Sequence, residues 1–417
     1  MARILWMTIP AQGHITPTLA VVEALVGRGH AVSYLSTPSH AATVAAAGAE
    51  PILYATSWSA RGAEGGDQPT DVDASEVAAW APLVMLTEAA AQIPAARRHL
   101  DETDDVSLLV YDTTTRVVAR SLAHAHGLVG VEVFPSFASA PGFSLTEHLP
   151  DPDDDGGSAV SVDPGHPALV EFHRLAREIL TDAGGPARTP EELAEQAEQR
   201  SVVFVPRRFQ PGAEAFDPSF RFVGPALDRS RPGGRRGEAT WAPPADGRPV
   251  VLLSWGTEEP RADAAFLRDR TRAFVDAGRY PVVSTGSVPP EALGDLGPHA
   301  EAAPSVPQPA VLAGASAFVT HAGMGSTMEG LFHRVPLVAT PKTPEQAAIA
   351  RRIEELGLGT TRSYAGSSPA DLVDAVDAVT DDPSVAAALR RFRDDIDDAG
   401  GPGQAADDIE DLLPLSV

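Results

Sequence analysis

The sequence predicts an α/β protein built from two doubly wound domains, each a parallel sheet with helices on both faces. Short apolar runs alternate with helical segments along most of the chain, which is the pattern of βαβ units. A segment rich in Pro, Gly and Arg divides this alternation into two halves, as a domain linker does. The length of 417 residues is sufficient for two separate hydrophobic cores.

The first domain opens with a predicted buried strand at residues 3–9 and a turn at residues 10–14. We predict that a helix opens at Thr16–Thr18 and ends near Gly29, because Pro17 suits a first helical turn and Gly suits a helix end. The next strand, at residues 30–35, completes a βαβ unit. Gly13 and His14 therefore lie at the carboxyl end of the first strand, where α/β sheets place their ligands.

A second polar residue is expected at the same edge of this sheet. Residues 107–111 read as a buried strand that ends in Asp112, directly before another helix. The imidazole of His14 titrates near neutrality and suits a general base, and a carboxylate beside it raises its basicity. The alternative for both residues is a role in capping a helix start, and Asp112 suits both roles at once.

The remaining elements set the domain limits. Residues 201–206 form the last predicted strand of the first domain, and strands at 249–254, 281–284, 317–320 and 336–339 build the second. Near the end, residues 397–401 break a helix and 404–413 begin another. We therefore predict domains at 1–210 and 249–396, a linker at 211–248 and a separate C-terminal helix at 397–417.

One stretch of the second domain, residues 315–330, is suited to binding an anion. A short apolar strand ends at Thr320, and Gly323 and Gly325 allow a tight turn. Ser326 is a predicted N-cap and Glu329 its capping-box partner. The N-terminus of such a helix offers free N–H groups and a positive dipole end, which suit a diphosphate. An ordinary strand–helix turn is the alternative.

The spacing in this stretch is neither that of a Walker loop nor that of G-x-G-x-x-G. With the flanking segments VPQ (306–308) and PKTPEQ (341–346), it resembles the donor-binding signature of family 1 glycosyltransferases. The run HAGMGSTMEG at 321–330 is most similar to the bacterial macrolide, or oleandomycin glycosyltransferase-like, branch. This resemblance implies the GT-B fold, in which two Rossmann-like domains face one another across a cleft and the final helix crosses back to the first domain.

The resemblance also implies roles for residues. His14 is the catalytic base and Asp112 its orienting partner. His321 and the small residues after it contact the donor diphosphate, and Glu329 binds the ribose hydroxyls. Val306 and Gln308 belong to the segment that contacts the nucleobase. Glu345 and Gln346 bind the donor sugar. The residues implied in donor binding are Gly256, Thr257, Val306, Gln308, His321, Gly323, Gly325, Ser326, Thr327, Glu329, Glu345 and Gln346.

Two positions depart from the family pattern. Ser305 stands where many relatives have a Trp that stacks on the uracil, so the choice between uridine and thymidine stays open. Glu345 replaces the usual Asp of the sugar clamp and is one methylene longer. Lys342, next to this clamp, is the only lysine of the chain.

The amino-acid composition disfavours several kinds of binding partner and metal site. The net charge of -25 disfavours nucleic acid and anionic membranes, and the absence of Cys excludes disulfides and thiolate metal sites. No apolar run is long enough to span a bilayer, no signal peptide is recognised, and a cytoplasmic location is expected. No strand precedes the acidic motif at Asp153 and Asp155, so it is interpreted as a solvated loop. The resemblance implies transfer without a metal, and no cofactor is expected because the nucleotide sugar is a co-substrate.

The function expected from the resemblance is inverting transfer of a hexose, with UDP-glucose as the favoured donor. The acceptor is a hydroxyl of an apolar natural product, such as a macrolide or other polyketide, and the protein is a monomer or homodimer. Two other classes remain open at this point: a non-catalytic GT-B partner of another transferase, and a GT-B sugar-nucleotide epimerase.

Overall fold

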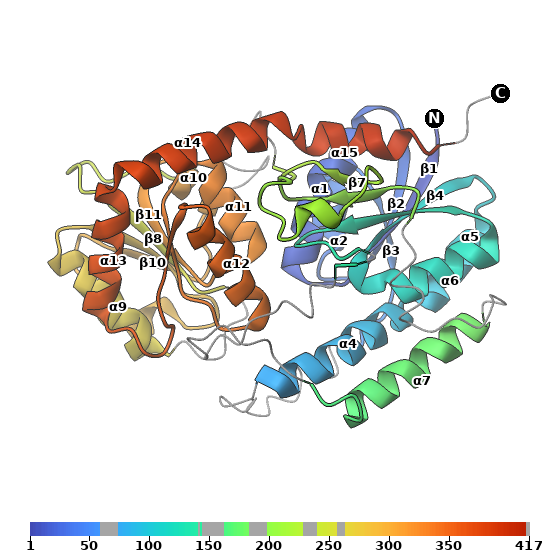
Figure 1. The fold of residues 1–417 in the computed structure, drawn as a ribbon, viewed down its shortest axis with the longest axis horizontal. Helices are drawn as coiled ribbons and strands as arrows, with labels where there is room; N and C mark the ends of the chain where they lie inside the picture. Colours follow the sequence, from blue (N-terminus) through green and yellow to red (C-terminus); the bar gives the residue numbers. More distant parts are fainter. Residues whose placement is uncertain are drawn as a thin grey trace.

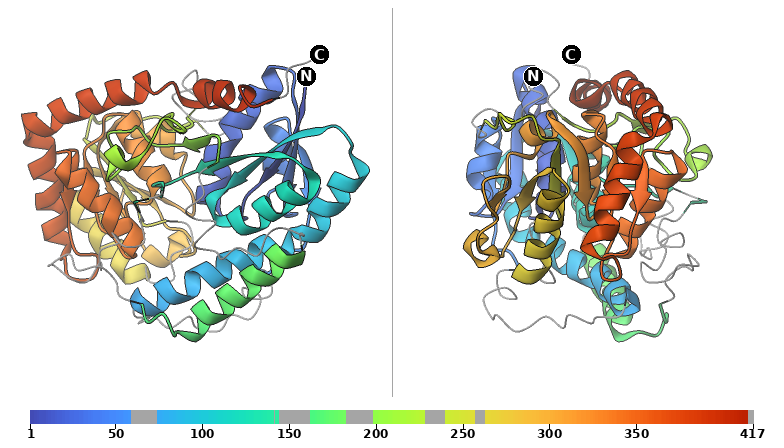
Figure 2. Two further views of the ribbon diagram at one scale, coloured as in Figure 1. Left: turned by 45° about the vertical axis from the view of Figure 1, so that its right-hand side comes forward. Right: turned by 90° about the vertical axis from the view of Figure 1, so that its left-hand side faces the viewer.

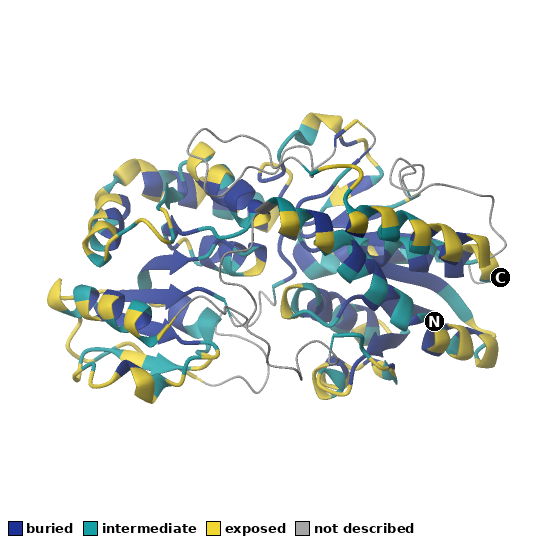
Figure 3. Cartoon of the chain, turned by 90° about the horizontal axis from the view of Figure 1, so that it is seen from below, coloured by how far each residue is buried: buried dark blue, intermediate teal, exposed yellow. Residues whose placement is uncertain are grey.

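The computed structural model describes residues 1–58, 74–140, 142–143, 162–182, 198–227, 240–256 and 263–413. It contains two α/β domains side by side, each with a parallel sheet between layers of helices (Figure 1). Seen from below, the strands are buried and the exposed residues lie on the outer faces of the helices (Figure 3). The predicted fold class is therefore confirmed. None of the helices within the described ranges is long and apolar enough to cross a membrane.

The first domain contains a seven-stranded sheet in the order β3-β2-β1-β4-β5-β6-β7, with every neighbouring pair parallel. Its strands are β1 (Arg3–Met7), β2 (Ala31–Ser36), β3 (Glu50–Leu53), β4 (Val106–Asp112), β5 (Val129–Phe134), β6 (Ser201–Val203) and β7 (Phe220–Phe222). Its helices are α1 (Gln12–Gly27), α2 (Ala41–Ala46), α4 (Ala74–Ala91), α5 (Ile93–Glu102), α6 (Arg116–His126) and α7 (Pro167–Asp182), with short 3-10 turns η1 (Thr113–Thr115) and η3 (Ala213–Ala215).

Alternation along β1 explains the layers of this domain. Ile4 and Trp6 point to the face covered by α1 and α2, whereas Leu5 and Met7 point to the face covered by α4, α5, α6 and α7. Because both faces are covered, apolar residues on β1 and on the central part of β4 occupy successive positions rather than alternating with polar residues.

The second domain contains a six-stranded parallel sheet in the order β10-β9-β8-β11-β12-β13. Its strands are β8 (Val250–Ser254), β9 (Tyr280–Ser284), β10 (Glu301–Ala303), β11 (Ala315–Thr320), β12 (Leu337–Ala339) and β13 (Gly359–Thr361). Its helices are α9 (Ala264–Asp276), α10 (Gln308–Leu312), α11 (Met324–Phe332), α12 (Pro344–Glu355), α13 (Pro369–Asp381) and α14 (Pro383–Asp398), with the turn η4 (Pro290–Leu293). β8 alternates in the same way: Val251 and Leu253 face α9 and α13, and Val250 and Leu252 face the opposite core.

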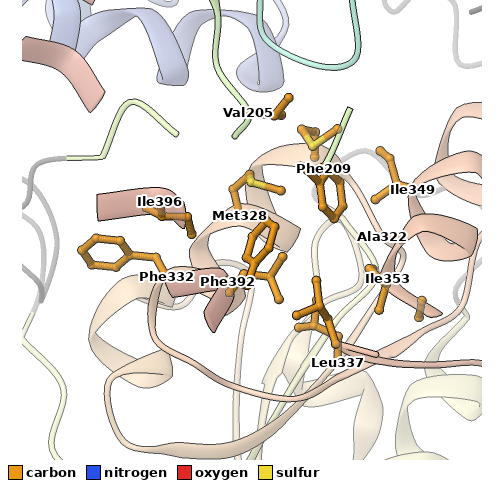
Figure 4. Close-up of a cluster of buried hydrophobic side chains, with 14 of the residues drawn as sticks. Val205, Phe209, Ala322, Met328, Phe332, Leu337, Ile349, Ile353, Phe392 and Ile396 are labelled. Atoms are coloured by element: carbon orange, nitrogen blue, oxygen red, sulfur yellow. The ribbon is translucent and has the colours of Figure 1, made fainter. Parts of the chain in front are cut away.

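The two domains share one hydrophobic core on the side of α12 and α14. Phe209, from the segment after β6, stacks edge-on against Phe392 of α14 with ring centroids 5.6 Å apart. Figure 4 shows Val205 and Phe209 beside Phe332, Phe392 and Ile396 of the second domain. A continuous core here fixes one side of the boundary, so any opening between the domains must pivot about it.

The predicted first boundary at residue 210 is placed too early. β7 lies inside the segment predicted as linker, pairs with β6 and completes the first sheet. The Pro- and Gly-rich composition of 211–248 hid this three-residue strand, because so short a strand has no periodicity of its own. The Arg-rich part of the linker at 229–237 lies outside the described residues.

The chain ends by crossing back over the first domain. After α14, helix α15 (Gly401–Glu410) continues along the top of the molecule in Figure 1, and the left view of Figure 2 shows it beside α1. Arg28, next to α1, donates to Asp407 at 2.7 Å and to Glu410 at 2.6 Å. This is the crossing expected for residues 397–417, and the structure describes it as far as residue 413.

Two helix starts differ from the predictions. α1 begins at Gln12, so Pro17 lies inside the helix and His14 lies in its first turn rather than in the preceding loop. α11 begins at Met324 with Gly323 as its N-cap, and no side chain makes a capping hydrogen bond. The predicted N-cap at Ser326 is therefore wrong, because the backbone turns into the helix at Gly323, three residues earlier than the side-chain pattern indicates.

Candidate active site

A cavity of about 600 Å³ lies between the two domains. One face of α1 lines it on the first-domain side, from Gln12 through Thr16 to Glu23. Opposite, α11 and the loop before it contribute His321, Gly323, Met324, Gly325, Ser326, Met328, Glu329 and Phe332. The loop after β10 contributes Ser305 and Val306, and the start of α10 contributes Gln308. The cavity thus joins the carboxyl ends of β1 and β11, the edge at which doubly wound sheets bind ligands.

His14 and Asp112 meet next to this cavity. β1 and β4 are neighbours in the sheet, which brings the first turn of α1 to the end of β4. His14 Nδ1 lies 2.8 Å from Asp112 Oδ2, and Gly13 beside it lines the cavity. Asp112 is fully buried, whereas the imidazole is 26 % exposed. The carboxylate is therefore protected and the ring has an open side.

Asp112 also caps the turn that follows it. Its Oδ1 accepts from Thr114 N at 2.8 Å and from Thr114 Oγ1 at 2.6 Å, while Oδ2 faces His14. The two alternatives from the sequence, capping and support of His14, are both present in one residue. These bonds fix the carboxylate, and the carboxylate in turn fixes the imidazole.

The environment of His14 shifts its titration. Burial lowers the pKa of the imidazole, but the charge and hydrogen bond of Asp112, together with the charge of Glu345, outweigh burial and raise the pKa above the ordinary 6.5. An Nδ1–H held by Asp112 leaves Nε2 as the atom that accepts a proton. This arrangement suits a general base, because the carboxylate raises the basicity of the ring.

His321 is closely packed by glycines. A Cβ on Gly323 would stand 2.5 Å from His321 Nε2, and one on Gly256 would stand 3.5 Å from the same ring. Gly256 has φ 96°, and Ala322 between His321 and Gly323 has φ 63°, which is unusual for a residue with a side chain. Glycine is needed at 323 for space and at 256 for backbone conformation.

Gln308 joins two of the predicted donor residues. Its Nε2 donates to Glu329 Oε2 at 2.7 Å and to Ser326 Oγ at 3.1 Å. Ser326 and Glu329 therefore face the cavity together instead of forming a capping box. Val306, next to this group, also lines the cavity, whereas Thr327 is fully buried on the inner side of α11.

The predicted sugar clamp lies at the N-terminus of α12. Glu345 Oε1 accepts from Ser136 Oγ, a residue of the first domain, at 2.6 Å. Gln346 Oε1 accepts from the backbone N–H of Lys342 at 2.9 Å. Glu345 is near enough to affect the pKa of His14, so the clamp and the proposed base are electrostatically coupled. Thr257 lies outside the described residues.

Sequence reasoning missed Ser136. It follows β5 at that strand's carboxyl end, so the same rule that selected His14 and Asp112 points to it. The sequence analysis also did not select His333, which lines the cavity. Burial and the nearby Arg393 lower the pKa of His333 to about 4, so this ring is neutral at pH 7.

The chain is similar to known proteins over almost its whole length. Residues 282–412 match the family model described as erythromycin biosynthesis protein CIII-like, C-terminal domain. The chain is 33 % identical to NDP-glycosyltransferase YjiC of Bacillus licheniformis, over 97 % of this chain and 96 % of that protein. It is 32 % identical to oleandomycin glycosyltransferase of Streptomyces antibioticus, over 99 % of this chain and 91 % of the relative.

The chain belongs to the GT-B macrolide glycosyltransferase family. The crystal structure of CalG4, the calicheamicin glycosyltransferase, superposes on this GT-B transferase with a TM-score of 0.83 and 32 % identity, and covers 99 % of this chain and 98 % of that one. Membership makes the protein a hexosyltransferase of the natural-product type that uses nucleotide diphosphate sugars.

Proposed function

We propose that the protein is a cytoplasmic, inverting O-glycosyltransferase that moves a hexose, with UDP-glucose as the favoured donor, to a hydroxyl of a macrolide or other apolar polyketide. The observation that carries the mechanism is the His14–Asp112 pair beside the interdomain cavity. A relative named oleandomycin glycosyltransferase supports the class of acceptor. The acceptor binds against the first domain and the donor against the second.

The proposed step is a single displacement at the anomeric carbon. His14 Nε2 takes the proton of the acceptor hydroxyl as its oxygen attacks from the side opposite the leaving group. The new C–O bond forms as the bond to the β-phosphate oxygen breaks, so the configuration inverts and the nucleoside diphosphate leaves. Asp112 stabilises the imidazolium that forms. The N–H groups and dipole at the start of α11 stabilise the charge on the diphosphate without a resident metal or cofactor.

Mass spectrometry of the products tests this proposal. The wild-type protein is incubated with UDP-glucose or dTDP-glucose and with a panel of macrolides and phenols. We expect a product heavier by one hexose, with the larger yield from UDP-glucose, β linkage by NMR from the α-linked donor, and no loss of rate in EDTA. Release of a free or epimerised sugar without an acceptor would contradict the proposal, and so would binding of donor without transfer to any acceptor.

Glu329→Ala is expected to weaken donor binding. The Glu329 carboxylate, oriented by Gln308, is proposed to accept hydrogen bonds from the ribose hydroxyls. Losing hydrogen bonds to a charged group costs about 1.5–3 kcal/mol, so UDP affinity should fall roughly 10- to 100-fold. Calorimetry with UDP measures this, and Glu355→Ala, on the exposed end of α12, is the matched control. Equal affinities in the two variants would remove Glu329 from the donor site.

Ser305→Trp is expected to strengthen nucleotide binding. Ser305 is exposed and lines the cavity beside Val306, so there is space for a larger ring. An indole here would add a stacking surface for the base, worth about 1–3 kcal/mol in base–aromatic contacts. Since about 1 kcal/mol corresponds to about 5-fold, the UDP and dTDP affinities measured by calorimetry should rise about 5-fold or more. The control is Ser316→Trp, which lies outside the cavity. Unchanged affinity would place the base elsewhere.

A further inference from the structure

Lys342, the only lysine of the chain, connects several parts of the proposed donor site. It lies in the loop between β12 and α12, directly before the helix that carries Glu345 and Gln346. The other side chains with a permanent positive charge are all Arg. A Lys ammonium differs from a guanidinium because it is compact and its three donors rotate freely on a flexible stem.

The ammonium of Lys342 is held at the end of β8. Nζ donates to the carbonyl oxygen of Trp255 at 2.9 Å and lies 4.9 Å from the centroid of the Tyr364 ring. Trp255 is buried, and its Nε1 donates to Thr340 Oγ1 at 3.0 Å in the same loop as Lys342. The carbonyl oxygen and the indole N–H of Trp255 are thus both hydrogen-bonded to the β12–α12 loop.

Fixing Trp255 fixes the residue after it. Gly256 lines the cavity beside the His321 ring, where the donor diphosphate is proposed to lie. Lys342 also contacts the sugar clamp: its backbone N–H donates to Gln346 Oε1 at 2.9 Å, which sets the orientation of the Gln346 amide. Lys342 therefore contacts both the backbone segment proposed to lie beside the diphosphate and the Gln346 side chain proposed to bind the sugar.

We propose that Lys342 is the positioning residue of the donor site: its ammonium ties the Trp255–Gly256 segment to the sugar clamp and brings one positive charge next to the diphosphate. This inference rests on the proposed donor site. The local charge counts because the chain carries a formal net charge of -25, which opposes the approach of an anionic donor. Its effect should appear in donor binding and not in acceptor binding.

Lys342→Met tests the positioning role, since Met has similar length and no charge. We expect the KM for UDP-glucose to rise roughly 10- to 100-fold, the range for losing a charge-assisted hydrogen bond, with the acceptor KM unchanged. Lys342→Arg should restore most of the donor KM because it keeps the charge and a donor. The matched control is Arg279→Met, which removes an ion pair with Asp377 in the same domain but outside the cavity lining. A purely structural role would lower the Tm and shift both KM values together.

Acetylation gives a test that does not depend on folding of a variant. When the folded wild-type protein, without a tag, is treated with an amine-selective acetylating reagent, the amines available for reaction are Lys342 and the terminal amine. Acetylation removes the ammonium charge, so donor KM should rise as in Lys342→Met. Lys342→Arg has no lysine left and should be insensitive to the same treatment. Intact-mass measurement verifies that the side chain has reacted.

The results separate this inference from the proposed function. Wild-type binding of UDP and dTDP is measured by calorimetry alongside. If wild type binds and transfers while acetylated protein and Lys342→Met keep the wild-type donor KM, the role of Lys342 is overturned and the transferase stands. If wild type binds neither nucleotide, the proposed donor site itself is wrong and the role of Lys342 falls with it.

Discussion

His14→Ala should abolish detectable sugar transfer while leaving nucleotide binding intact. General-base catalysis by a positioned side chain contributes about 10²- to 10⁴-fold, and Ala offers no atom that accepts the acceptor's proton. UDP affinity should not change, because the proposed nucleotide contacts come from the second domain. The product yield by mass spectrometry and the UDP affinity by calorimetry measure these two quantities on one preparation.

The control for His14→Ala is His124→Ala. His124 is exposed in the last turn of α6, a helix that returns from the carboxyl edge of the sheet to its amino edge. This variant removes an imidazole without touching the cavity, so its transfer rate should equal that of wild type. Hexose transfer that survives in His14→Ala would keep the transferase but assign the base to another group.

Asp112→Asn should lower kcat by about 10²- to 10⁴-fold, the range that general-base catalysis contributes, because His14 would lose the correct tautomer and its charge support. Asn can still accept from Thr114 N through its oxygen, so the cap is kept. Its amide nitrogen would face His14 Nδ1 and donate to it, which leaves the proton on Nε2. The ring would then present a donor to the acceptor hydroxyl instead of a base.

The pH profile tests the same pair. His14 acts as a base only when neutral, so the rate should rise as pH passes its pKa, which Asp112 holds above 6.5. Removing the carboxylate charge lowers that pKa. In Asp112→Asn the rising limb of kcat/KM should therefore move to lower pH while its plateau falls. Asp105→Asn, an exposed Asp paired with Arg3 at the other end of β4, is the control and should leave the limb in place. An unmoved limb in Asp112→Asn would mean that another group titrates.

Much of the fold follows from local patterns in the sequence. The alternation of apolar runs with helices predicted two parallel sheets, because strands covered on both faces must be apolar throughout. The rule that ligands lie at the carboxyl ends of strands selected His14 and Asp112. The glycine turn and the helix start after a predicted strand selected the stretch from His321 to Glu329. These inferences need only the order of elements along the chain. The structure places the selected residues beside or within one cavity. Thr257, another predicted donor residue, lies outside the described residues.

Local signals failed where several backbone solutions were equally good. The pattern around Ser326 suits a capping box, but the turn at Gly323 starts α11 earlier and leaves Ser326 to face Gln308. The strand β7 is too short for a period, and only its pairing with β6 reveals it. In both cases the final structure depends on neighbours that the local sequence does not contain.

The sequence by itself therefore determined the fold class, the two-domain organisation and the chemical types gathered at the site. Tertiary structure alone decided which of those groups touch. His14 meets Asp112 across 98 residues because β1 and β4 are adjacent, and Ser136 meets Glu345 across 209 residues because the domains pack on a shared core. Periodicity fixes which face a side chain takes within its own element, but a contact between distant residues depends on strand order and domain packing. Both are set by the total burial of apolar surface over the whole chain.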